Sequence, residues 1–77
     1  MDKRNLTLSS IEERIEDIEK HIRYHDICHM KEDYLWYLVL CAISEGADDP
    51  KELAQTALKT LAIDYQRGFD VTELEEV

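Results

Sequence analysis

The sequence has very few residues that interrupt helices. It contains two glycines and one proline among 77 residues, and neither type occurs before Gly46. Because glycine and proline are the strongest local breakers of regular structure, the first half of the chain favours long helices. With 44% hydrophobic residues the chain also differs from disordered proteins, so we expect a folded, all-α domain.

Cysteine is also scarce. Cys28 and Cys41 are the two cysteines, and no C-x-x-C motif is present, which excludes a disulfide framework and is typical of a reducing compartment. The charged first residues are not followed by the apolar segment of a signal peptide. The longest apolar run, residues 34–43, is too short to span a bilayer. We therefore expect a soluble protein of the cytoplasm.

Basic residues are few compared with acidic ones. The chain has 9 Lys and Arg against 18 Asp and Glu, which gives a formal charge of −9. Binding to nucleic acid or to anionic lipid depends on Lys and Arg, so this balance argues against direct contact with either. A partner protein with a basic surface would instead be attracted.

Two overlapping capping boxes predict the first helix. Ser9 and Ser10 each precede a glutamate by three residues, a pattern in which the two side chains satisfy free backbone N–H groups. We therefore expect a helix that begins near residue 10. Isoleucines follow at spacings of four, three and four residues, which is typical of a helix that packs along another one: Ile11, Ile15, Ile18 and Ile22.

The same spacing continues to His25, His29, Glu32 and Trp36, so histidines stand where further isoleucines are expected. The following segment is apolar nearly all round, which predicts a central core element or an oligomer interface. We assign this role to Ile11, Ile15, Ile18, Ile22, His25, His29 and Trp36.

Residues 29–33 are compatible with two arrangements. An unbroken helix from residue 10 to residue 45 would be about 54 Å long and would require a dimer to cover it. A break at residues 29–33 would give a compact bundle. The continuous spacing favours the first arrangement and the small size of the chain favours the second, which we adopt.

A further helix is predicted after the turn at Gly46. Asp49 suits the N-cap, Pro50 the first helical position and Glu52 the third, and Gly68 suits the end. The apolar face of this helix comprises Leu53, Ala57, Leu58, Leu61, Ala62 and Tyr65.

These predictions combine into one all-α domain that covers residues 1–77. It is a small bundle with helices over about 10–30, 33–45 and 50–67, a short C-terminal helix near 70–73, and frayed ends at 1–8 and 75–77. A chain of this length buries only about 60% of its surface on folding, so we also expect a homo-oligomer, most simply a dimer.

One alternative is a metal-binding helical protein. His25 and His29 lie four residues apart on one helical face, with Glu32 three residues further on, and imidazole and carboxylate groups bind zinc or iron. Helical bundles hold ions in this way but need a second pair of ligands, which the sequence does not offer. We therefore favour an interfacial or half-buried role for the two histidines and expect no metal or other cofactor.

Catalytic motifs are not found. Glu13 and Glu16, with Glu45 and Asp48, match the letters of the magnesium-binding pairs of MazG-type nucleotide pyrophosphatases, but the second pair spans Gly46 in a predicted turn. Glutamate is so frequent in this sequence that such matches arise by chance. We predict that the protein is not an enzyme.

The acidic residues indicate a protein-interaction function. We expect the partner-binding surface to comprise Glu45, Asp48, Asp49, Glu52, Glu12, Glu13 and Glu16. The predicted function is that of an inhibitor or regulator that binds a basic surface of a partner, for example by imitating the phosphates of a nucleic acid. Small inhibitors of host defence carried by phages and mobile elements share this size and charge. A structural or regulatory homo-oligomer is a second alternative.

Overall fold

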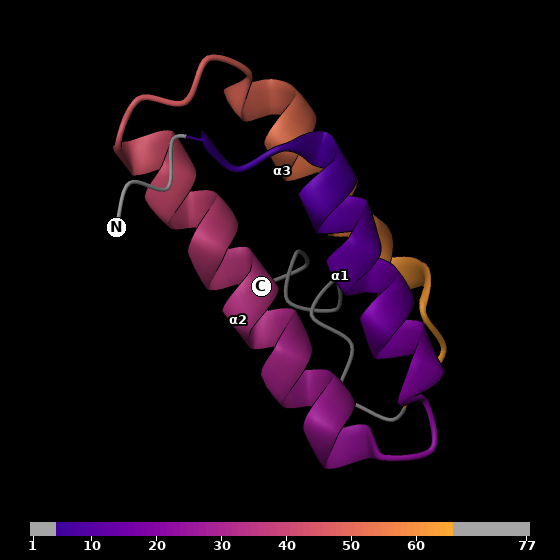
Figure 1. Cartoon of the computed structure of the whole chain (residues 1–77). Helices are drawn as coiled ribbons and strands as arrows, with labels where there is room; N and C mark the ends of the chain where they lie inside the picture. The colour runs from indigo at the N-terminus through magenta and orange to yellow at the C-terminus, as the bar shows by residue number, and fades with distance from the viewer. Residues whose placement is uncertain (1–4, 66–77) are drawn as a thin grey trace, which may run out of the picture.

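The computed structural model describes residues 5–65, and all regular structure within this range is helical. The elements are α1 (Leu8–Lys20), α2 (His25–Ser44), α3 (Pro50–Ala57) and the 3₁₀ helix η2 (Leu58–Ala62). Helices α1 and α2 form a hairpin and α3 packs against both (Figure 1). The all-α bundle is thereby confirmed. The predicted C-terminal helix near 70–73 and Gly68 lie outside the described residues.

Helix α1 begins two residues earlier than the sequence predicted. Thr7, not Ser9 or Ser10, is the N-cap residue, and its Oγ1 accepts a hydrogen bond from the Ser10 N–H at 3.1 Å. A threonine in extended conformation is a favourable N-cap, so both serines lie in the first helical turn. Leu6, which the sequence placed in a frayed end, packs against the core just before the helix.

The break between the first two helices lies at residues 21–24 and not at 29–33. Helix α2 runs without interruption from His25 to Ser44, so residues 29–33 are inside it. The loop contains no glycine or proline. The chain reverses there because α1 and α2 then cover each other's apolar faces, which a continuous helix would leave exposed.

This earlier break changes which face of α2 is buried. Six residues of α2 are buried, and all of them except Leu38 are spaced four, three, four and three residues apart: Cys28, Glu32, Leu35, Leu38, Val39 and Ala42. Of the residues assigned to the seam, Ile11, Ile15 and Ile18 are buried, Trp36 is half-buried, and Ile22, His25 and His29 are exposed. The predicted continuation of the seam through the two histidines is therefore wrong, because the helical phase restarts at His25.

Gly46 ends α2, as the sequence predicted. Its φ of +91° is in the left-handed region that favours glycine. The N–H groups of Gly46 and Ala47 donate to the carbonyl oxygens of Ile43 and Ala42, at 3.1 and 3.0 Å. This Schellman arrangement satisfies two carbonyl groups at the end of the helix and turns the chain toward α3.

Helix α3 is shorter than predicted. Pro50 is its first residue and Asp49 its N-cap residue, as expected, but the α-helix ends at Ala57 and a 3₁₀ helix follows. With three residues per turn, Ala57, Thr60 and Ile63 share one face, and all three are buried. Leu58 and Ala62, which an α-helix would have turned inward, are exposed instead.

The core joins the three α-helices. Ile11, Ile15 and Ile18 of α1 pack with the buried face of α2, with Leu53 and Ala57 of α3, and with residues after η2. None of the helices within residues 5–65 combines the length and apolar character that a membrane-spanning segment requires.

Candidate protein-interaction surface

The seven acidic residues predicted to bind a partner are all exposed. Glu12, Glu13 and Glu16 lie on α1, Glu45 is the C-cap residue of α2, and the others lie in the α2–α3 turn and the first turn of α3. The position of Glu52 near the positive end of the α3 dipole stabilises that helix. Exposure at all seven positions makes these carboxylates accessible to a partner.

The fold brings the turn acids next to the start of α1. Asp48 and Asp49 line a surface hollow of about 450 Å³ together with Leu53 and residues 5–8. Glu12 follows Leu8 by one helical turn, a rise of about 6 Å along the axis. The acids of the turn and of early α1 are therefore grouped at one end of the bundle, although they are about 35 residues apart in sequence.

The cations of residues 5–65 form no ion pair with these seven carboxylates. The ion pairs among the described residues join Asp17 to Lys31 and His21, and His29 to Asp33. None of the seven acids takes part in them. Their charge is thus directed to solvent, where it can attract a basic surface.

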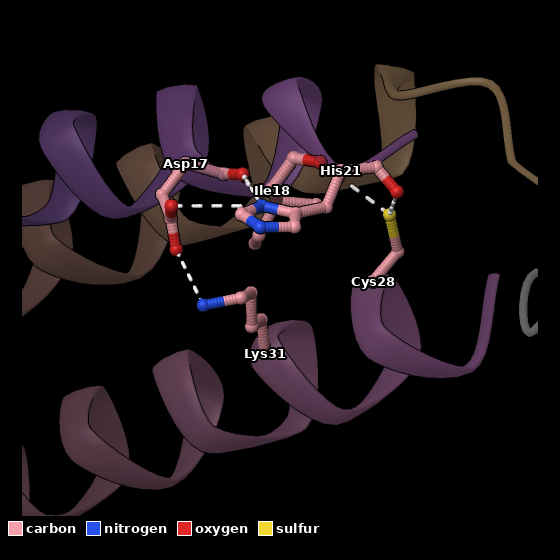
Figure 2. A network of polar contacts seen from close by, with 5 residues as sticks. All are labelled: Asp17, Ile18, His21, Cys28 and Lys31. Carbon is pink, nitrogen blue, oxygen red and sulfur yellow. Dashed lines mark hydrogen bonds and ion pairs between the residues drawn. The ribbon is translucent and has the colours of Figure 1, made fainter. Parts of the chain in front are cut away.

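Asp17 has a different role, since it connects the first two helices. Its Oδ2 accepts a hydrogen bond from Nζ of Lys31 on α2 at 2.6 Å, and its Oδ1 lies 3.6 Å from Nδ1 of His21 (Figure 2). The hydrogen bond from Lys31 is the main cause that lowers the pKa of Asp17 below its ordinary value of 3.8. The charges of Lys31, His21 and Lys20 act in the same direction, and partial burial opposes them.

Polar contacts at the end of α1 hold the hairpin loop. The Nδ1–H of His21 donates to the carbonyl oxygen of Asp17 at 2.8 Å. The buried Cys28 thiol on α2 donates to the carbonyl oxygens of His21 and Ile18, at 3.0 and 3.4 Å (Figure 2). The sequence did not predict these hydrogen bonds from Cys28 to the end of α1.

The residues of the metal-binding alternative do not come together. His25 and His29 are exposed, whereas Glu32 is buried on the core side of α2. His29 lies beside Asp33, at 3.5 Å between Nε2 and Oδ2. Within residues 5–65, no three His, Cys, Asp or Glu side chains are placed to hold a metal ion.

A second surface feature is apolar and lies on α2. Four large side chains are exposed along it, namely Met30, Tyr34, Tyr37 and Leu40. The sequence predicted that this segment is apolar all round but did not show which side chains would remain uncovered. These four residues are spaced four, three and three apart, which indicates one side of a helix. The pattern can be recognised in the sequence only once the buried face of α2 is known.

Trp36 and Leu40 also border an apolar groove between α2 and α3. The groove has a volume of about 180 Å³ and is lined further by Val39, Ile43, Ala54, Ala57 and Leu58. Nε1–H of Trp36 donates to Oγ1 of the buried Thr60 at 3.1 Å, which fixes the indole at the edge of the groove. An apolar groove beside exposed aromatic side chains is typical of a protein-binding surface.

Comparison with known protein families, with curated proteins and with solved structures finds no match to this chain. The functional interpretation therefore depends on the surface described above.

Proposed function

We propose that this chain is a small acidic interaction protein that acts without catalysis, by binding a basic surface of a partner protein. The observation that carries the proposal is the group of seven exposed carboxylates, none of them in an ion pair among the described residues. Unpaired surface charge of one sign accelerates the encounter with a complementary partner and excludes partners of like charge.

The exposure of these acids on the helices supports a more specific form of this function. Carboxylates at the α2–α3 turn and along the outer side of α1 present separated negative charges on a rigid helical frame, as phosphates do on a nucleic acid. A protein that binds nucleic acid through Lys and Arg would bind such a surface as a competitor. The chain would then inhibit or regulate its partner by occupying that site.

A cytoplasmic location accompanies this proposal. Cys28 and Cys41 are both free, and Cys28 donates hydrogen bonds as a thiol, which agrees with a reducing compartment.

The test is a charge reversal at the α2–α3 turn. The tagged chain captures its partner from a lysate of its native host at low salt, and the captured protein is then purified and its affinity measured. Replacing Asp48, Asp49 and Glu52 by lysine should weaken binding by at least roughly tenfold, because attraction becomes repulsion. The affinity of the unaltered chain should fall as salt rises, and heparin should compete.

The matched control reverses three exposed acids outside this surface, Glu19, Asp26 and Asp64, and so makes the same change in net charge. If both triple variants bind equally weakly, net charge alone is responsible and the proposed surface is wrong. If affinity is unchanged by either variant and by salt, the charge-based function is refuted.

A further inference from the structure

We draw no further inference here: the strongest candidate, the exposed apolar stripe along α2 formed by Met30, Tyr34, Tyr37 and Leu40 and continued by the groove between α2 and α3, carries none because nothing among the described residues shows what covers it.

Discussion

Asp17 accepts a hydrogen bond from Lys31 and lies beside His21 at the contact between α1 and α2. These neighbours lower its pKa below 3.8, so the folded chain takes up a proton at this site less readily than the unfolded chain. The ion pair therefore contributes stability above the ordinary pKa, and that contribution is lost as the pH falls through 3.8 and then below it.

Asp17→Asn should accordingly lower the melting temperature at neutral pH. The difference in melting temperature between wild type and variant should become smaller as the pH falls below 3.8. Thermal unfolding followed by circular dichroism at several pH values measures this difference. Glu12→Gln, which alters an exposed acid outside any described ion pair, is the control. A constant difference between wild type and Asp17→Asn at every pH would show that Asp17 acts by packing and not by its charge.

Trp36 is a second residue whose contacts should contribute measurably to the free energy of unfolding. Its indole packs against the core cluster and donates a hydrogen bond to Thr60. Trp36→Ala should lower the free energy of unfolding by about 3 kcal/mol. Trp36→Phe keeps most of the packing but removes the donor and should cost about 1 kcal/mol. Urea unfolding measures both, and equal losses for the two variants would mean that the hydrogen bond dominates.

The sequence predicted single residues well where the type of side chain restricts its position. Three of the four isoleucines at helical spacing, Ile11, Ile15 and Ile18, are in the core, and charged residues at the turn are exposed. It was wrong about the histidines, because their burial depends on the helical phase after the loop. The hydrogen bonds of Cys28 go to carbonyl oxygens on the other side of the α1–α2 loop, which residue type does not indicate.

At the scale of elements, the end of α2 is determined locally. Gly46 adopts a φ of +91°, and a Cβ added there would meet nothing within 4 Å. The cost of a side chain at this position is therefore backbone strain and not a clash.

Gly46→Ala should reduce the free energy of unfolding by about 1–2 kcal/mol, the penalty of a left-handed residue with a Cβ. Gly46→Asn should lose less, because asparagine tolerates this conformation. Chemical denaturation of the two variants compares them. A stabilised alanine variant would indicate that the turn adopts another conformation in solution.

The starts of α1 and α3 were predicted to within two residues, but α2 begins eight residues before its predicted start at residue 33, and the helix lengths were not predicted. Asp49 and Pro50 correctly marked the start of α3, since an N-cap residue and a proline at the first position act locally. The change to a 3₁₀ helix at Leu58 has no local signal. It places Thr60 inward to receive the hydrogen bond of Trp36, a residue on another helix.

The whole molecule carries more negative charge than its ion pairs compensate. The chain has eighteen acidic residues and nine basic ones. The folded state holds the acidic residues closer together than the unfolded chain does. Self-repulsion of this kind destabilises the compact state, and salt screens it.

We therefore expect sodium chloride to raise the melting temperature of the dilute chain. Replacing Glu12, Glu13 and Glu16 by glutamine should raise it at low salt and should also reduce the response to added salt. Differential scanning calorimetry provides the comparison. A melting temperature that falls with salt would mean that attractive ion pairs outweigh the repulsion.

The sequence by itself determined that the chain is helical, that its surface is acidic, that α2 ends at Gly46 and that α3 begins at Pro50. These features depend on composition and on contacts within one helical turn. The tertiary structure decided where α1 and α2 separate, because no local breaker occurs between His21 and Tyr24 and the reversal follows from two apolar faces covering each other. That reversal also set the helical phase of α2. It thereby decided that His25 and His29 face solvent and that Met30, Tyr34, Tyr37 and Leu40 remain exposed.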